Sequence, residues 1–395
     1  MVRLLPLLVA GLSVLPAVEA DWPQYRGPAR SGVSAETGFF AGLKDGPQVL
    51  WKSTVGIGFT SPVVVKGRVY AAGNSKDVDT LYCFDAATGK PATGWINFSY
   101  PAKLGANGYD GGPTATPTIA GGVLYGLGKD GLAYCLDAAT GTLRWSKDLA
   151  AELTPKRPDW GFASAPLVVD GRVYLNIGRS GTCLDATSGA VLWKSDPDKA
   201  GYAGIVPLDA AGHGLLVFSS DRLLLARAET GAIAWELPWA TTYGVNAADP
   251  IVHGTQVFVC SGYGFGGGVY DLSGPQPKEL WKNKALRTQM SPALLLDGHL
   301  YGFDDKTLKC VSWADGAVKW EQKGLGQGTL VAAERRLVIL SEKGELVIAE
   351  AVPERFTELS RGQVLTGRCW TPPALAGGRV FCRNAKGDLV AVELR

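Results

Sequence analysis

Short strands of alternating apolar and polar residues follow one another along most of the chain, and a similar sequence motif recurs between them. In this motif a turn rich in Asp, Thr and Gly leads into a strand that carries tryptophan. A repeat of about 40 to 50 residues in which each unit consists of strands predicts a propeller or a solenoid. The motif appears as DAATGKPATGW from Asp85, DAATGTLRW from Asp137, DATSGAVLW from Asp185, RAETGAIAW from Arg227 and SWADGAVKW from Ser312.

Proline marks the first strand of most units. A turn such as DGRVY then leads into a second strand, and a third strand precedes the Asp-Gly turn and the outer Trp strand. An eighth opening, without proline, begins at Gly328. We therefore predict an all-β fold, a propeller of eight four-stranded antiparallel blades. The seven openings with proline are SPVVV at Ser61, TPTIA at Thr116, APLVV at Ala165, VPLDA at Val206, DPIVH at Asp249, SPALL at Ser291 and TPPAL at Thr371.

The last unit lacks its outer strand. It runs from Thr371 to Arg395 and stops after the third strand, while QVLWKSTV at residues 48–55 has the form of the missing one. We expect the N-terminal strand to complete the last blade, because closure removes two exposed sheet edges. Residues 48–395 then form a single propeller domain.

The tryptophans of the outer strands are predicted to be structural. Each presents a large apolar face that a neighbouring blade can bury. The Asp and Gly of the preceding turn are also structural, since Asp accepts local backbone bonds and Gly adopts positive φ. The predicted interblade residues are Trp51, Trp95, Trp145, Trp193, Trp235, Trp281 and Trp320.

The first residues indicate export. Residues 1–20 contain Arg3, an apolar run from Leu4 to Leu15, and small residues before Asp21, as in a cleaved secretory leader. A membrane anchor is the alternative, but the run is shorter than the roughly 20 residues that a span needs. Cys83 is the first cysteine, so no lipid-anchor cysteine follows the leader. We expect a periplasmic or secreted protein with no membrane span.

Charge and cysteine content change this picture little. A formal charge of +2 indicates neither a nucleic-acid partner nor an acidic membrane, and we expect a monomer. Four cysteines occupy equivalent positions in different repeat units. Equivalent positions of two units lie too far apart for a disulfide, so we expect these cysteines to be core residues. The other three could allow one pair. The four are Cys83, Cys135, Cys183 and Cys310, and the three are Cys260, Cys369 and Cys382.

These units resemble the PQQ-like repeat, with its AxDxxTGxxxW pattern, of quinoprotein dehydrogenases and of the outer-membrane assembly lipoprotein BamB. The resemblance covers residues 48–395. Residues 21–47 form an N-terminal extension, and its segment DWPQYRGPARSGVSAETG looks like the extension of exported PQQ-like repeat proteins. Because one fold serves many functions, the resemblance predicts the architecture and leaves the function open.

Resemblance to the dehydrogenases would imply PQQ in the mouth of the ring, with Ca²⁺ on Glu, Asn and Asp oxygens, an Asp base, an Arg at the quinone and a disulfide between adjacent cysteines. The chain has no adjacent cysteines, no haem-binding CxxCH and little spare loop length. A partial match is YGVNAADP, whose Asn246 and Asp249 could hold a hard cation, with Arg287 beside the quinone. We expect no catalytic residue, metal or cofactor; PQQ with Ca²⁺ is the alternative.

The connections from each outer strand to the next inner strand gather at one end of a propeller, where ligands usually bind. Two arginines among aromatic and amide residues there would suit an anionic or sugar-like ligand. Alternatively, these arginines pair with Asp110, Asp159 or Asp249 and order the loops. The predicted ligand-binding rim comprises Tyr109, Asp110, Trp160, Tyr202, Tyr243, Asn246, Asp249, Arg287, Gln289, Arg368 and Trp370.

Three functions follow from these observations. The first is an exported, non-enzymatic propeller that binds a protein partner or a small polar or anionic ligand through this loop face. The second is a PQQ- and Ca²⁺-dependent quinoprotein dehydrogenase of alcohols or sugars. The third is an outer-membrane protein assembly factor like BamB.

Overall fold

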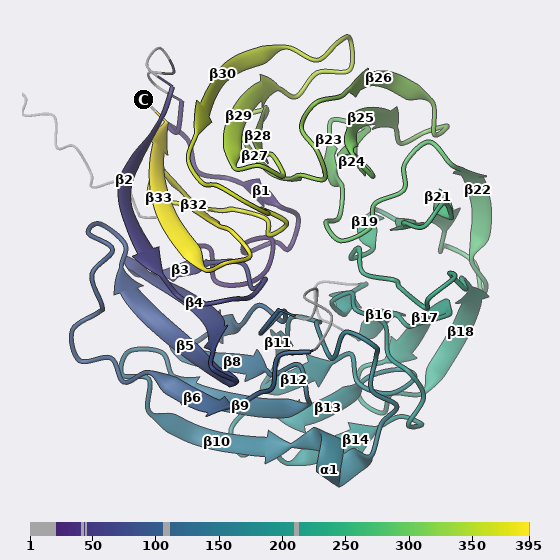
Figure 1. Ribbon diagram of the computed structural model, residues 1–395. Coiled ribbons are helices and arrows are strands. Elements are labelled where there is room, and N and C mark those ends of the chain that lie inside the picture. Colours follow the sequence, from purple (N-terminus) through teal and green to yellow (C-terminus); the bar gives the residue numbers. More distant parts are fainter. Residues whose placement is uncertain (1–20, 41–42, 44–45, 106–110, 209–212, 395) are drawn as a thin grey trace, which may run out of the picture.

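Eight sheets stand around a central axis like the blades of a wheel (Figure 1). This computed structural model describes residues 21–40, 43, 46–105, 111–208 and 213–394. The predicted leader, Tyr109 and Asp110 lie outside the described residues. The prediction of an eight-bladed, all-β propeller is confirmed.

Blades 1 to 7 are each built on a meander of four strands that are consecutive in the chain, and the fourth lies at the outer rim of the propeller; in blade 8 the outer strand comes from the N-terminal part of the chain (Figure 1). A short helix, α1 (Leu149–Leu153), follows the second blade. Blade 1 contains β3 (Val63–Val65), β4 (Arg68–Ser75), β5 (Val78–Asp85) and β6 (Phe98–Pro101); blade 2 contains β7 (Thr118–Ala120), β8 (Val123–Leu127), β9 (Leu132–Asp137) and β10 (Leu143–Asp148); blade 3 contains β11 (Leu167–Val169), β12 (Arg172–Leu175), β13 (Thr182–Asp185) and β14 (Val191–Lys194); blade 4 contains β15 (Val206–Pro207), β16 (Gly214–Phe218), β17 (Arg222–Arg227) and β18 (Ile233–Pro238).

The second half of the wheel repeats this order, and its last two blades recruit the N-terminal strands. Blade 5 contains β19 (Ile251–His253), β20 (Gln256–Ser261), β21 (Gly266–Asp271) and β22 (Lys278–Asn283); blade 6 contains β23 (Leu294–Leu296), β24 (His299–Asp304), β25 (Thr307–Ser312) and β26 (Val318–Gln322); blade 7 contains β27 (Thr329–Ala333), β28 (Arg336–Leu340), β29 (Glu345–Glu350) and β30 (Glu358–Gln363), with β1 (Val33–Ser34); blade 8 contains β31 (Ala374–Ala376), β32 (Arg379–Arg383) and β33 (Asp388–Leu394), with β2 (Pro47–Thr54).

Strand β2 closes the ring as predicted. It pairs antiparallel with β33, in a register that runs from Pro47 opposite Leu394 to Thr54 opposite Asp388. The Lys52 ammonium lies 3.1 Å from an Asp388 carboxylate oxygen at the end of this register. The last blade therefore presents no unpaired third strand.

The outer tryptophans join neighbouring blades by hydrogen bonds as well as by packing. Five of them donate Nε1–H to a backbone carbonyl of the next blade, and the ring is then fixed against that blade. Trp95 differs, because its Nε1 has no partner among the described residues. The five bonds join Trp51 to Ala86 (3.0 Å), Trp145 to Ala186 (3.0 Å), Trp193 to Ala228 (2.8 Å), Trp281 to Trp313 (2.7 Å) and Trp320 to Val352 (2.8 Å).

Backbone conformation and lack of space both require glycine in some of the turns between strands. Gly231 has φ of +71°, and a Cβ built on it would lie 2.6 Å from the ring of Trp193 in the preceding blade.

We expect Gly231→Ala to lower the free energy of unfolding by more than about 2 kcal/mol, because the alanine would strain the backbone and displace the Trp193 ring. Gly298→Ala is the matched control, since Gly298 has φ of +73° and open space; it should cost only about 1 kcal/mol. Equal losses in urea titrations would contradict the role of the Trp contact.

The N-terminal extension runs across the inner strands. Trp22 exchanges two backbone hydrogen bonds with Val64, of 2.7 and 2.9 Å, and its side chain is buried. Strand β1 then pairs parallel with β27. The extension therefore ties together blades that are not neighbours in sequence. Its other contacts are Pro23 O with Ile119 N, Arg26 Nη2 with Ala293 O, Arg30 Nη1 with Pro166 O, and the Glu36 carboxylate with Gly377 N and Gly378 N.

All seven cysteines lie in the described part of the chain, and each is buried with a free thiol. Burial raises the pKa of Cys83 to about 12 and that of Cys183 to about 11, which makes these thiols unreactive. The alternative pair among Cys260, Cys369 and Cys382 does not form. Within the same described ranges, no helix is both long and apolar enough to cross a bilayer.

Candidate ligand cleft

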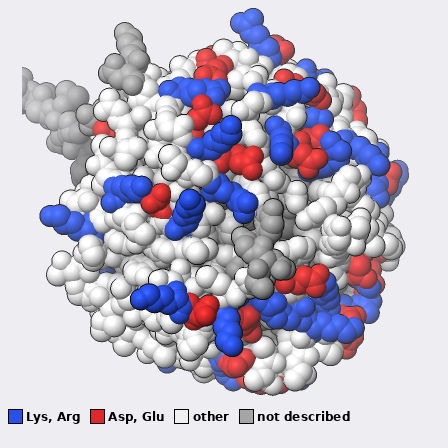
Figure 2. All heavy atoms as spheres, viewed as in Figure 1, with Lys and Arg blue, Asp and Glu red and all other residues white. Residues whose placement is uncertain are grey.

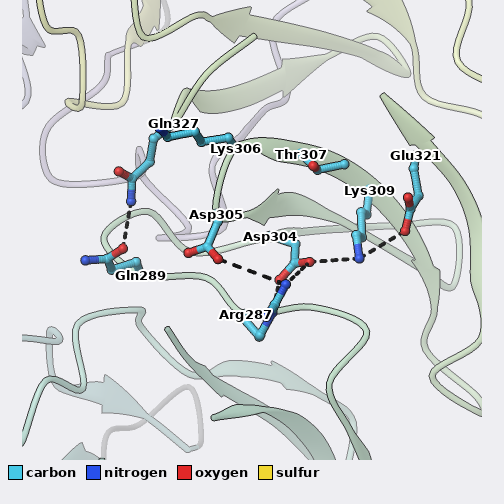
Figure 3. A pocket seen from close by; sticks show the side chains of 9 residues that line it. All are labelled: Arg287, Gln289, Asp304, Asp305, Lys306, Thr307, Lys309, Glu321 and Gln327. Carbon is cyan, nitrogen blue, oxygen red and sulfur yellow. Dashed lines mark hydrogen bonds and ion pairs between the residues drawn. The ribbon is translucent and has the colours of Figure 1, made fainter. Parts of the chain in front are cut away.

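A cleft of about 570 Å³ lies where blade 6 meets the connections that flank it (Figure 3). One wall comes from the connection between β22 and β23, and another from the tight β24–β25 turn with the strands beside it. The connection between β26 and β27 adds a third. We call this the cleft; its lining residues are Arg287, Gln289, Asp304, Asp305, Lys306, Thr307, Lys309, Glu321 and Gln327.

A chain of ion pairs forms the base of the cleft (Figure 3). The Arg287 guanidinium donates to both carboxylate oxygens of Asp304, at 2.5 and 2.8 Å. The Lys309 ammonium lies 2.8 Å from Asp304 Oδ2 and 3.0 Å from Glu321 Oε1. The Asp304 side chain at the centre of this chain is only 3% exposed, while Arg287 and Glu321 at its ends are 31% and 45% exposed. Charge-assisted bonds to a buried carboxylate hold this wall of the cleft in place.

Opposing effects act on the ionisation of this chain. Burial alone would raise the pKa of Asp304, but hydrogen bonds from Arg287 and Lys309 hold it below its usual value. Burial likewise acts to lower the pKa of Lys309, and its bonds to Asp304 and Glu321 raise it overall. Asp304 and Lys309 therefore both stay ionised at neutral pH.

Two glutamines bridge the cleft beside this chain. Gln327 Nε2 donates to Gln289 Oε1 at 2.9 Å, and the Gln327 backbone N–H donates to the Glu342 carboxylate at 3.2 Å. The amide nitrogen of Gln289 and the amide oxygen of Gln327 are not used in this bond (Figure 3). The pair therefore offers one donor group and one acceptor to a ligand.

A second, narrow pocket of about 10 Å³ shares Gln289, Asp305 and Gln327 with the cleft. Ser291 and Trp370 line it. Ser291 Oγ and Trp370 Nε1 are both buried and have no hydrogen-bond partner among the described residues.

Neighbouring side chains hold the Trp370 ring in place. It packs on Phe59 with 6.2 Å between ring centroids and 24° between planes, and the Arg368 guanidinium lies 4.3 Å from the ring centroid. These two contacts fix the orientation of the indole ring.

The cleft lining carries three cations and three anions, which cancel. Charges of both signs are also interspersed over the face of the molecule seen in Figure 2. No single-sign field would draw an ion into this region. The cations are Arg287, Lys306 and Lys309, and the anions are Asp304, Asp305 and Glu321.

The predicted rim residues fall into separate groups. Arg287 and Gln289 lie in the cleft, and Trp370 lines the second pocket beside Arg368. Two aromatic pairs lie elsewhere, with ring centroids 6.0 Å apart for Trp160 and Tyr202 and 5.2 Å apart for Tyr243 and Tyr263. Among the described residues Arg287 pairs with Asp304 and, at 4.0 Å, with Asp305, and not with Asp159 or Asp249 as considered from the sequence.

A family model described as outer membrane protein assembly factor BamB matches residues 92–322 and 304–395. The chain belongs to this PQQ-like repeat family. A solved PQQ-like structure, BamB from Moraxella catarrhalis, is 18% identical with a TM-score of 0.64, over 88% of this chain and 97% of that one. Quinohemoprotein alcohol dehydrogenase from Comamonas testosteroni is 14% identical with a TM-score of 0.69, over 95% of this chain and 80% of that one. At these identities the likeness shows the fold alone.

Curated relatives match a smaller part of this PQQ-like chain. The dehydrogenase subunit of alcohol dehydrogenase (quinone) from Komagataeibacter europaeus is 33% identical over 150 residues, which are 34% of this chain and 19% of the relative. Quinohemoprotein alcohol dehydrogenase ADH-IIG from Pseudomonas putida is 31% identical over 140 residues, 31% of this chain and 20% of the relative. The chain thus matches about a fifth of the length of these relatives.

The residues proposed for a PQQ-like calcium site do not fit that role. Asn246 is fully buried, and its amide donates to Ser219 O at 2.8 Å and Trp239 O at 3.1 Å while its Oδ1 accepts from Ser261. An amide held by three such bonds has little to offer a cation. Within the ranges that the structure describes, no group of three or more His, Cys, Asp and Glu side chains could hold a metal.

The Asp249 carboxylate interacts with a backbone amide and with the N-terminal extension. Its Oδ1 accepts from Gly204 N at 2.7 Å, and its negative charge acts on Arg26 and Arg30 of the N-terminal extension. Two nearby guanidinium groups oppose the binding of a cation at this carboxylate. Arg287 meanwhile belongs to the cleft, so the three residues do not form one site.

Sequence reasoning missed the acidic and basic residues that complete the cleft. Asp304 and Lys309 flank the β24–β25 turn, and Glu321 lies on β26. The available signal was the turn sequence FDDKTLK, which brings four charged side chains into one short hairpin. The rule that ligands bind at the connections between blades does not extend to a hairpin within one blade.

Proposed function

We propose that this chain is an exported, non-enzymatic propeller that binds a small polar ligand in the cleft. One observation carries the proposal: the cleft is a preformed concave site with polar groups already held in place by ion pairs to the buried Asp304 carboxylate. The export part rests on residues 1–20, which have the composition of a secretory leader.

The structure of the wall supports binding over catalysis. Each charge at the base is neutralised by a partner, and Asp304 and Lys309 are held in their charged forms. A general acid or base works best with a pKa near the working pH, and this chain moves both groups away from it. Such a wall can orient a ligand by hydrogen bonds without transferring a proton to it.

A thermal-shift screen of polar metabolites tests the proposal. We expect at least one compound to raise the melting temperature, and Arg287→Ala to weaken its binding about tenfold or more, because the mutation frees Asp304 to move and removes a wall of the cleft. Gln327→Ala should also weaken binding, and it leaves the ion pairs intact.

Arg361→Ala is the matched control. Arg361 makes a similar fork to Glu358 and a third bond to Glu345, and its side chain is 35% exposed against 31% for Arg287. It lies on β30, and the control should bind the ligand normally. A screen without hits, or equal loss in both arginine variants, would overturn the proposal.

A quinone-dependent alcohol dehydrogenase is the second candidate, because the curated relatives carry that name. The arrangement of Asn246 and Asp249 weighs against it, as does the short stretch of similarity. Calorimetry with PQQ and Ca²⁺, together with a dye-reduction assay on primary alcohols, separates the candidates. Heat of binding with turnover would favour the dehydrogenase.

A role in outer-membrane protein assembly is a third candidate, which the description of the matching family model suggests. Exposed aromatic residues at Trp160, Tyr243 and Tyr263, which are 38%, 55% and 39% exposed, could contact a protein partner. Recovery of barrel-assembly components with the tagged protein, lost in Tyr243→Ala, would favour this role over the binding of a small ligand.

A further inference from the structure

We infer that the inner edge of β11 in blade 3 is a docking site for an extended peptide segment of a partner, in which an apolar residue pairs with Val168 and the basic residue before it pairs with Asp170. This surface is separate from the cleft, and the inference does not depend on the ligand of the cleft. A second hairpin of the same ring, whose inner edge already binds a segment of the chain, shows the mode of docking.

The inner edge of blade 1 binds the start of the N-terminal extension. Trp22 exchanges two backbone hydrogen bonds with Val64, of 2.7 and 2.9 Å, and Asp21 Oδ1 accepts from the Lys66 backbone N–H at 2.8 Å. Val64 is free to make these bonds because every second residue of an edge strand points its N–H and C=O away from the neighbouring strand. The dipeptide Asp21–Trp22 thus adds to this edge as a short extra strand.

The hairpin of blade 3 repeats the hairpin of blade 1. The register of β11 with β12 matches that of β3 with β4, and the turns have the same left-handed backbone, with φ of +49° at both Lys66 and Asp170. The N–H and C=O of Val168 therefore point toward the central axis, as those of Val64 do. The two sequences are VVVKGRVY from Val63 and LVVDGRVY from Leu167.

The inner edge of β11 is accessible. Within the part of the chain that the structure describes, the Val168 N–H and C=O have no hydrogen-bond partner, and Val168 is partly exposed where Val64 is only 4% exposed. A Cβ built on Gly171 in the adjoining turn would have no other heavy atom within 4 Å. Arg30 of the N-terminal extension donates to Pro166 O at 3.3 Å, just before β11. The edge therefore continues the surface that already binds the extension.

The turn after β11 determines which charge the segment should carry. Blade 3 has Asp170 where blade 1 has Lys66, and the segment bound to blade 1 begins with the acidic Asp21. The Asp170 side chain is exposed and has no ion pair among the described residues. It would attract a basic residue at the position of Asp21 and repel an acidic one. Because an exposed ion pair contributes little, we expect this preference to be about two- to fivefold in affinity.

An NMR titration of the full chain tests the inference with two capped tetrapeptides. One has the sequence lysine–tryptophan–proline–glutamine, and the other begins with aspartate and so copies residues 21–24. We expect the lysine peptide to shift the amide signal of Val168 and to bind about two- to fivefold more tightly than the aspartate peptide. Methylation of the tryptophan amide nitrogen in the lysine peptide removes a donor of the pairing and should weaken binding about fivefold.

Two substitutions separate the charge of this turn from other effects. Asp170→Lys gives blade 3 the turn charge of blade 1 and should reverse the preference in favour of the aspartate peptide. Asp297→Lys is the matched control, because blade 6 has the same Asp-Gly turn after a partly exposed Leu295, but the Asp297 carboxylate already binds Arg335 at 2.6 Å. This control should keep the preference for lysine, and thermal melts show whether both variants are folded.

Four outcomes would overturn the inference. They are equal binding of the two peptides to the unmodified chain, an unchanged preference in Asp170→Lys, signal shifts confined to other blades, and no binding of either peptide.

Discussion

A variant that lacks residues 21–56 should lose its cooperative thermal transition and most of its solubility. The deletion removes β2, so β33 loses a partner that runs from Pro47 to Thr54 and becomes an exposed edge. It also removes Trp51, whose indole N–H bonds blade 1 at Ala86. Circular dichroism melts and size-exclusion chromatography measure the effect.

A shorter deletion separates closure from the other contacts of the extension. A variant that lacks residues 21–40 keeps β2 but loses the bridge of Trp22 to Val64 and strand β1. It should melt cooperatively at a lower temperature, since the ring stays closed. A normal cooperative melt of the variant with the longer deletion would show that β2 is dispensable and that closure of the ring does not contribute to stability.

Replacement of Arg383 by methionine should lower the free energy of unfolding by about 3 kcal/mol, because it leaves several buried carbonyl groups without donors. The Arg383 side chain is fully buried in blade 8 and donates to Gly56 O at 3.1 Å, Thr60 Oγ1 at 3.0 Å and Ala72 O at 2.6 Å, all in or next to blade 1. Burial lowers the pKa of this guanidinium, which lies among neutral acceptors.

Arg379→Met is the matched control for this effect. Arg379 lies on the same strand, β32, is partly exposed, and makes one bond of 3.2 Å to Ala86 O. It should cost less than about 1 kcal/mol. Urea titrations of both variants provide the comparison, and equal midpoints would contradict the idea that Arg383 joins the closing blade to the first one.

The architecture of this protein was readable from its sequence because each blade repeats the same local chemistry. Proline at the inner strand, a glycine turn and an outer tryptophan recur in most blades. The strand around Trp51 belongs to no unit of its own and can complete only the last blade, which lacks an outer strand. The path of the N-terminal extension was not readable. Arg26 bonds a backbone carbonyl at Ala293, and carbonyls leave no mark in a sequence.

The candidate site was readable only in part, for a similar reason. Arg287 and Gln289 stand on a connection between blades, and loops there are expected to meet ligands. Asp304, which binds both Arg287 and Lys309, comes from a hairpin of the next blade, and only the fold brings that hairpin to Arg287. The sequence places Asn246 in a loop, but its side chain makes three hydrogen bonds within the core.

The pairing of β2 with β33 also constrains the order in which the chain can fold. Pro47 and Leu394 are neighbours in the sheet but stand near opposite ends of the sequence, and contacts of such separation slow folding. During synthesis β2 emerges early and has no partner until β33 follows. Seven blades can form as their strands appear, whereas the eighth must wait for the last strand of the chain.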